Sequence, residues 1–127
     1  MKRADMKTFK RGMFILLCVM QVAIQVASAA AAEEGEASYY ADSLHGSKTA
    51  SGVFYDKRAL SAAHPSLPFG TKVKVTCLKT GHSVVVVIND RGPYAKDRII
   101  DLSGAAAKRI GLIDAGHGRV RLEIMEP

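Results

Sequence analysis

Apolar and polar residues alternate over much of the second half of the chain, and this pattern predicts short β-strands. Residues 71–78 alternate cleanly, with Val73, Val75 and Cys77 on the side expected to be buried. Residues 119–125 alternate in the same way. Three further segments are shorter or more apolar. In all, we expect strands at residues 37–40, 71–78, 83–88, 98–102 and 119–125.

One of these segments, residues 83–88, is apolar at nearly every position. It contains four consecutive valines followed by an isoleucine. A continuous apolar run is typical of a strand that is covered on both faces, as in a closed barrel. We therefore expect both faces of this strand to be buried.

A helix is predicted directly after residues 98–102. Ser103 is a suitable N-cap, the three alanines at 105–107 favour a helix, and Gly111 can end it. Residues 41–70 are rich in Gly, Ser, His and Pro and predict no clear regular element. Short strands with one or two brief helices indicate a mainly β fold, a small barrel whose closure protects its strand edges.

The N-terminal segment has the three-part pattern of a secretory signal peptide. Residues 1–12 carry five basic residues and one acidic residue, an apolar run starts at Met13, and small residues end it. Because this run is nearly long enough to cross a bilayer, a retained membrane anchor is the alternative. We expect a signal peptide at 1–29 with cleavage as late as Ala32, an acidic linker at 30–36 and a barrel domain at 37–127.

The charge of the chain depends on this segment. The whole sequence carries 18 Lys and Arg against 12 Asp and Glu, a formal charge of +6. Cleavage after Ala29 removes five basic residues and one acidic residue, which leaves 127 − 29 = 98 residues with 13 − 11 = +2. A nearly neutral domain does not suggest nucleic acid as a partner. The protein is expected outside the cytoplasm, in the periplasm or the cell envelope.

The two cysteines add little chemistry. Cys18 lies inside the apolar run and follows Leu16 and Leu17, whereas lipoprotein processing needs a small residue at that place, so we expect no lipid anchor. Cys77 would then be the one cysteine of the mature domain and could form no internal disulfide. Its place in an alternating strand predicts a small buried side chain rather than a reactive thiol.

Three polar, turn-rich stretches could line a functional site: residues 45–52, 62–70 and 89–94. Ser51, His64 and Asp90 could be drawn as a hydrolase triad, but no nucleophile elbow surrounds Ser51. The four histidines lack the spacing of a zinc site, and no phosphate-binding loop is present, so we expect neither a metal nor a cofactor.

The carboxylates have plain structural interpretations as well as chemical ones. Asp90 follows an apolar strand and could simply bond its own turn. Asp101 could be a buried partner of Arg91 or Arg98. From residue type alone, these structural interpretations are favoured.

Taken together, the motifs resemble the rare lipoprotein A (RlpA) family of bacterial cell-envelope proteins. The resemblance runs from about Gly35 to Ile124, nearly the whole mature domain. The blocks that carry it are Ala37-Ser38-Tyr39-Tyr40, His45-Gly46, Thr49-Ala50-Ser51-Gly52, Ala62-Ala63-His64, Leu67-Pro68-Phe69-Gly70-Thr71, Asn89-Asp90-Arg91-Gly92-Pro93-Tyr94, Arg98-Ile99-Ile100-Asp101-Leu102-Ser103, Ala105-Ala106-Ala107 and Ile110-Gly111.

This resemblance implies a six-stranded double-psi β-barrel, related in fold to expansins and barwin-like proteins. It also implies an endolytic lytic transglycosylase that prefers glycan strands stripped of their stem peptides. Such an enzyme cleaves the bond between N-acetylmuramic acid and N-acetylglucosamine through attack by the muramic C6 hydroxyl, leaving a 1,6-anhydro end. One carboxyl group can protonate the leaving oxygen and then accept the C6 proton.

Some, but not all, of the family's site residues have a match in this sequence. Asp90 matches the family's catalytic aspartate and His64 its site histidine, so the resemblance implies that both are catalytic. Val53 stands where the family usually has a glutamate. Either Asp90 acts alone, or Asp56 or Asp101 assists it, or the domain only binds glycan. Arg91 matters because a neighbouring cation favours the charged carboxylate. The residues that could assist or bind substrate are Asp101, Asp56, Arg91, Ser51, Tyr94 and His45.

Two alternatives to the transglycosylase remain open. The first is a non-catalytic, expansin-like glycan-binding module, which Val53 favours. The second is a secreted polysaccharide hydrolase, which would leave reducing ends. In each case the expected partner is a glycan strand of peptidoglycan or a related polysaccharide, with cell-division or cell-wall machinery as a further partner and a monomer as the expected state.

Overall fold

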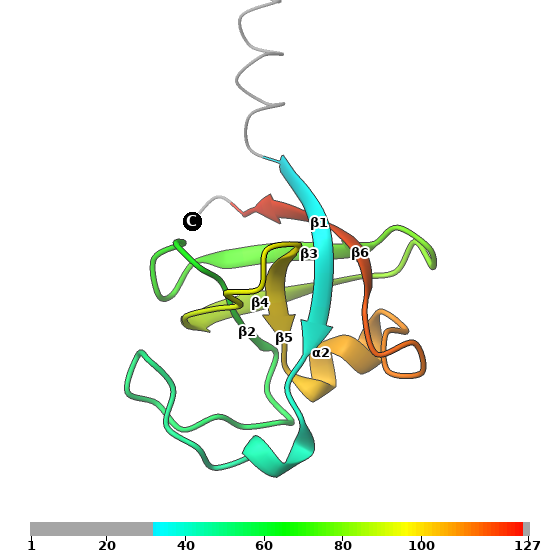
Figure 1. Cartoon of the computed structure of the whole chain (residues 1–127). Helices are drawn as coiled ribbons and strands as arrows, with labels where there is room; N and C mark the ends of the chain where they lie inside the picture. Colours follow the sequence, from blue (N-terminus) through cyan, green and yellow to red (C-terminus); the bar gives the residue numbers. More distant parts are fainter. Residues whose placement is uncertain (1–31, 126–127) are drawn as a thin grey trace, which may run out of the picture. The chain divides into compact units, whose positions relative to one another are not determined.

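Six strands form a closed barrel in the computed structural model, which describes residues 32–125 (Figure 1). Around the barrel the strands follow the order β1-β5-β2-β4-β3-β6. Their bounds are β1 Ala32–Tyr39, β2 Ser61–Ala63, β3 Lys72–Cys77, β4 Ser83–Asp90, β5 Arg98–Leu102 and β6 Gly118–Ile124. The mainly β barrel expected from the sequence is confirmed.

Two parallel pairs join segments that are far apart in the chain. β1 runs parallel to β5, and β2 runs parallel to β4. The remaining neighbours, β1 and β6, β2 and β5, β3 and β4, and β3 and β6, are antiparallel. In this order the C-terminal ends of β1, β5, β2 and β4 are paired with one another in sequence around the barrel.

The barrel interior holds the apolar positions of the alternating strands. Val73, Val75 and Cys77 of β3 are buried, as their alternation predicts. Cys77 is a free, buried cysteine, which agrees with its expected packing role. The interior is completed by residues of the other strands and of α2, including Ile88, Ile100, Leu102, Ile110, Val120 and Leu122.

The expectation that both faces of residues 83–88 are buried is wrong. Only every second side chain of β4 lies inside, and Val85 and Val87 are 41% and 37% exposed. The register places them beside Lys74 and Lys72 of β3, on the outer face of the sheet. A barrel has a single interior, so a valine run in it is buried at alternate positions only.

The N-terminal boundary of the barrel also differs from the expectation. β1 begins at Ala32, so most of the acidic segment 30–36 is strand and not linker. It pairs with β6 from Ala32 opposite Glu123 to Ala37 opposite Gly118, and Glu34 forms an ion pair with Arg121 at 3.2 Å. This cross-strand pair helps to stabilise the pairing of β1 with β6. The signal peptide expected at 1–29 lies outside the described residues.

Two short helices accompany the strands. α2, Gly104–Arg109, begins as predicted, with the Ser103 hydroxyl accepting a hydrogen bond from the Ala106 amide. The 3-10 helix η1, Asp42–Leu44, and the three-residue strand β2 come from the region 41–70, where no element was predicted. Among residues 32–125, no helix has the length and apolar character needed to cross a bilayer.

Candidate active site

The strand register aligns four residues in a row across β1, β5, β2 and β4. Ser38 is opposite Asp101, Asp101 is opposite Ala63, and Ala63 is opposite Asp90. A register shift just before Ala63 and Asp90 brings this pair into the row. Within the row the Ser38 hydroxyl donates a hydrogen bond of 2.5 Å to Asp101 Oδ1. Two of the predicted carboxylates therefore lie on one side of the barrel, two strands apart.

The carboxylate of Asp90 accepts hydrogen bonds from three donors. The backbone amides of Ala50 and Arg91 donate to Oδ1 at 2.8 and 2.9 Å. The phenol of Tyr40 donates to Oδ2. A carboxylate has about four lone-pair positions, so Oδ1 is fully used and Oδ2 keeps the greater capacity to take or give a proton. Of the two Asp90 oxygens, Oδ2 is therefore the one with room for a proton.

Tyr40 is a site residue that the sequence analysis did not identify. It directly follows β1, and its ring stacks on Tyr55 with the centroids 4.4 Å apart. Burial raises the pKa of the Tyr40 phenol, and the hydrogen bond and charge of Asp90 together with the charge of Asp101 raise it further. Tyr40 therefore stays a protonated donor. Its only sequence signal was its place in the Ser-Tyr-Tyr block, which says nothing of a partner 50 residues away.

The loop before Tyr55 brings the Ala50 amide to Asp90. The Thr49 hydroxyl donates to the Val53 carbonyl at 2.7 Å and lies 3.0 Å from the Ser51 hydroxyl. The Ser51 amide donates to the Asn89 carbonyl at 3.3 Å, which ties the loop to the end of β4. Ser51 thus helps to hold the loop against Asp90. The side chain of Val53 is 50% exposed, so the loop presents an apolar group there.

His64 contacts Asp90 through its backbone and not through its ring. Its amide donates to the Asp90 carbonyl at 3.2 Å. The buried imidazole accepts hydrogen bonds at Nδ1 from the amides of Ser66 and Leu67, both at 3.1 Å, while Nε2 lies 3.2 Å from Glu33 Oε1. These partners assign the ring proton to Nε2. Among residues 32–125, no hydrogen bond joins this ring to the Asp90 carboxylate.

Arg91 points toward the loop after β2. Its guanidinium donates to the carbonyls of His64 and Leu67 at 3.3 and 2.8 Å, and it lies 4.1 Å above the centre of the Phe69 ring. No ion pair within the described part of the chain joins Arg91 to Asp90 or to Asp101. The partner of Asp101 is Arg98, whose guanidinium lies 4.0 Å from it. The cation next to Asp90 in sequence therefore organises the loop 64–69.

Asp56 and His45 form a separate cluster. The Arg58 amide donates to Asp56 Oδ1 at 2.9 Å, and this bond, with the nearby Arg58 and His45, keeps the Asp56 pKa below its usual value. His45 Nδ1 accepts from the Lys57 amide at 3.2 Å. Both side chains thus close the turn at 56–59. In the described chain, neither forms a hydrogen bond or ion pair with Asp90.

Exposed apolar side chains come from the same loops that surround Asp90. Tyr94, two residues after Gly92, is 84% exposed, and Phe54 next to Val53 is 69% exposed. Phe69, beneath Arg91, is 42% exposed. Aromatic faces of this kind are suited to packing against sugar rings.

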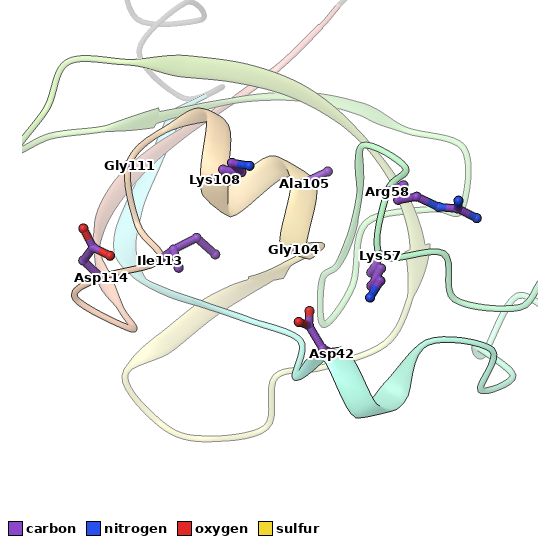
Figure 2. A pocket seen from close by; sticks show the side chains of 9 residues that line it. All are labelled: Asp42, Lys57, Arg58, Gly104, Ala105, Lys108, Gly111, Ile113 and Asp114. Atoms are coloured by element: carbon purple, nitrogen blue, oxygen red, sulfur yellow. The ribbon is translucent and has the colours of Figure 1, made fainter.

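A hollow of about 720 Å³ lies on the side of α2 and does not include Asp90 (Figure 2). Its wall at Gly104 touches the site indirectly, because the Gly104 amide donates to the Tyr55 hydroxyl at 3.0 Å. Residues 32–125 contain no group of three side chains arranged to hold a metal ion. The hollow is lined by Asp42, Lys57, Arg58, Gly104, Ala105, Lys108, Gly111, Ile113 and Asp114.

The family comparison agrees with the fold. The profile of the lytic transglycolase family matches residues 32–122, the whole barrel from β1 into β6. The chain belongs to this family. The match also starts at the first residue of β1, in agreement with the corrected boundary of the barrel.

Relatives with the RlpA name share about half of the aligned residues. The chain is 53% identical over 92 residues to the "Probable endolytic peptidoglycan transglycosylase RlpA" of Synechocystis sp., covering 72% of this chain and 29% of that protein. It is 50% identical to the "Endolytic peptidoglycan transglycosylase RlpA" of Pasteurella multocida, covering 75% and 32%. The resemblance to RlpA proteins is thus confirmed, and the chain spans about a third of the length of these curated relatives.

Solved structures support the barrel fold at much lower identity. The Streptomyces papain inhibitor matches with a TM-score of 0.60 and 24% identity, over 75% of this chain and 94% of that one. An expansin of Clavibacter michiganensis matches with the same TM-score and 20% identity, over 75% and 50%. These neighbours support the double-psi β-barrel fold that the resemblance implies.

Proposed function

We propose that this domain is an endolytic peptidoglycan transglycosylase in which Asp90 carries the proton. The observation that supports this most strongly is the fixed carboxylate, with Oδ1 held by two amides and Oδ2 facing one phenol. The name of the relatives, at 48–53% identity in the aligned region, points to the same reaction.

The proposed reaction needs one proton carrier. Protonated Asp90 gives its Oδ2 proton to the glycosidic oxygen, and the bond from that oxygen to the muramic C1 breaks. The muramic C6 hydroxyl forms a new bond to C1 and returns its proton to Oδ2. The products are a 1,6-anhydro end and a free hydroxyl on the leaving sugar, and Asp90 is protonated again. No water is consumed, in contrast with a hydrolase.

The surroundings of Asp90 support a single-carboxylate mechanism. Val53 cannot exchange a proton, and Asp56 is bound within its own turn. Asp101 lies in the same row as Asp90 but is engaged by Ser38 and lies 4.0 Å from Arg98. We therefore assign Asp101 to the shape and charge of the site. His64 holds the loop 64–69 through its two amide contacts.

Substrate contacts are proposed for the exposed side chains beside Asp90. Val53, Phe54, Phe69 and Tyr94 would cover the apolar faces of successive sugars on either side of the cleaved bond. A glycan without stem peptides fits such a surface because it presents sugar faces along its length. Ser51 and Arg91 contribute by fixing the loops that carry these groups.

Export to the cell envelope is part of the proposal. The basic start and apolar run of residues 1–29 indicate a signal peptide, and cleavage after Ala29 would leave β1 intact. The exported protein would act as a monomer in the periplasm, where peptidoglycan would be its partner. A link to cell-division or cell-wall machinery belongs to the same proposal.

The second candidate is a non-catalytic glycan-binding module, which the exposed valine at position 53 favours. One experiment separates the candidates: purified protein is incubated with peptide-free glycan strands, and the products are analysed by mass spectrometry. The transglycosylase yields 1,6-anhydromuramyl ends. Reducing ends would instead indicate a hydrolase, and intact strands at high protein concentration would support the binding module.

A further inference from the structure

Within the described chain, the Asp90 carboxylate accepts a hydrogen bond from a single side chain, that of Tyr40. Its other two donors are backbone amides, and both act on Oδ1. The phenol of Tyr40 acts on Oδ2, the oxygen to which the proposed reaction assigns the proton. Tyr40 is thus in direct contact with the atom that has to take and give a proton in each cycle.

Tyr40 is held in place from two directions. Its amide donates to the Leu102 carbonyl of β5 at 2.9 Å, which fixes the backbone. Its ring stacks on Tyr55 at 4.4 Å with 20° between the planes. Tyr55 is buried and is fixed in turn by the Gly104 amide at the start of α2. The phenol therefore reaches Oδ2 from a rigid base and needs little ordering when substrate binds.

We propose that Tyr40 is a positioning residue for Asp90, with its hydroxyl fixing Oδ2 and favouring the charged carboxylate that remains once the proton has been delivered. The proposal rests on the function assigned to Asp90 above. Tyr55 supports Tyr40 through the ring stack. Tyr40 exchanges no proton with substrate in this scheme; it sets the direction and the proton affinity of the oxygen that does.

The other charged groups around Tyr40 and Asp90 are left unchanged when only the Tyr40 hydroxyl is removed. Asp101 faces Tyr40 from β5, and its charge is offset by Arg98 at 4.0 Å. Tyr55 faces it from the loop side, and the Arg91 guanidinium is turned toward Leu67 and Phe69. Because burial and the two carboxylates raise the pKa of Tyr40, its hydroxyl stays protonated wherever Asp90 titrates. Any change in Asp90 titration after removal of this hydroxyl then reports the lost hydrogen bond.

The test compares Tyr40→Phe with Tyr39→Phe. The first variant keeps the ring and its stack and loses only the hydroxyl that binds Oδ2. The second removes the neighbouring hydroxyl, which donates to the Ile113 carbonyl at 2.9 Å and does not touch Asp90. The Asp90 carboxyl carbon is followed by NMR through a pH titration, which does not depend on activity. We expect the titration midpoint to rise by about one pH unit in Tyr40→Phe and to stay at the native value in Tyr39→Phe.

Activity on peptide-free glycan gives the second measurement. On the acid plateau of the pH profile, where Asp90 is protonated in both proteins, we expect kcat of Tyr40→Phe to fall about tenfold with KM unchanged. We expect the alkaline limb of its profile to move up with the NMR midpoint. An Asp90 midpoint equal to that of Tyr39→Phe overturns the proposal. A shifted midpoint with native kcat overturns the role in catalysis. If the native protein makes no anhydro ends, the proposed catalytic function of Asp90 is wrong. The NMR titration still decides whether Tyr40 affects the protonation of Asp90.

Discussion

The neighbouring residues His64 and Arg91 show how single side chains can serve a site without touching its reacting atoms. His64 Nδ1 accepts hydrogen bonds from two amides of the loop, and the Arg91 guanidinium donates hydrogen bonds to two carbonyls of the same loop. Together they fix the segment that carries Phe69. We therefore propose that both residues act through hydrogen-bond geometry rather than through proton transfer.

The role of His64 leads to a prediction that separates geometry from acid–base chemistry. His64→Ala leaves two loop amides without their acceptor in a buried place, and we expect a loss of about 1–3 kcal/mol in the free energy of unfolding. His64→Asn offers an oxygen close to the position of Nδ1, so it should recover most of that stability and most of the activity. Urea denaturation and the anhydro-end assay measure the two effects. Stable but inactive His64→Asn protein would show that the ring does more than hold the loop.

At this scale the sequence allowed part of the site to be predicted. Asp90 and His64 were identified from motif blocks, and the structure puts their backbones in contact. The fixing of Asp90 by Tyr40 could not be predicted, because it joins residues 50 positions apart. Glu33 was placed in a linker, since an acidic run looks like solvent-exposed chain, yet its carboxylate lies 3.2 Å from the His64 ring. Contacts of this kind depend on strand order, which alternation does not reveal.

Among the elements, β1 differs most from its prediction. It starts at Ala32, five residues earlier than expected, and pairs along β6. Gly35 lies in this added part, and a Cβ there would be 2.7 Å from Ile99 Cγ2. The close approach of β1 to Ile99 therefore requires glycine.

This contact predicts the outcome of Gly35→Ala. The added methyl must displace the Ile99 side chain, and we expect a loss of about 1–3 kcal/mol in the free energy of unfolding. Combining Gly35→Ala with Ile99→Ala should cost less than the sum of the two single changes, because the smaller side chain makes room. A denaturation series of the two single variants and the double variant measures this coupling. Strict additivity would mean that β1 does not pack on Ile99.

The start of α2 allows a second prediction for an element. The fully buried Ser103 hydroxyl donates to the Ala59 carbonyl at 2.6 Å and accepts from the Ala106 amide at 3.2 Å. Ser103→Ala loses the helix cap and the link to the chain before β2, so we expect a loss of about 1–3 kcal/mol. The control is Ser83→Ala at the exposed start of β4, which should change stability by less than about 0.5 kcal/mol. Thermal denaturation compares the two, and equal melting temperatures would contradict the prediction.

Elements with a clear pattern were predicted well, and short elements were not. β3, β5, β6 and α2 follow from alternation and capping, which are local properties. β2 has three residues, too few for a period to be visible, and it forms because β4 and β5 offer partners on both sides. The valine run of β4 correctly predicts a strand but wrongly predicts that both of its faces are buried. A run of one residue type does not show which face meets solvent.

For the molecule as a whole, barrel closure explains why the site is well defined in a small domain without an internal disulfide among its described residues. Closure satisfies the strand edges and aligns Ser38, Asp101, Ala63 and Asp90 across four strands. Loops then need only to bring amides, a phenol and aromatic faces to one carboxylate. The fold and the family could be expected from the sequence, whereas the asymmetry of the Asp90 oxygens required the structure.

We propose above all that Asp90 carries the proton that releases 1,6-anhydro ends. The most direct measurement is the yield of 1,6-anhydromuramyl products from peptide-free glycan, by mass spectrometry, for the native protein, Asp90→Asn and the control Asp114→Asn. Asp114 lies in the loop between α2 and β6, at the hollow of Figure 2, and is exposed. We predict that the native protein and Asp114→Asn form these products and that folded Asp90→Asn forms none. Native product levels from Asp90→Asn would contradict the account.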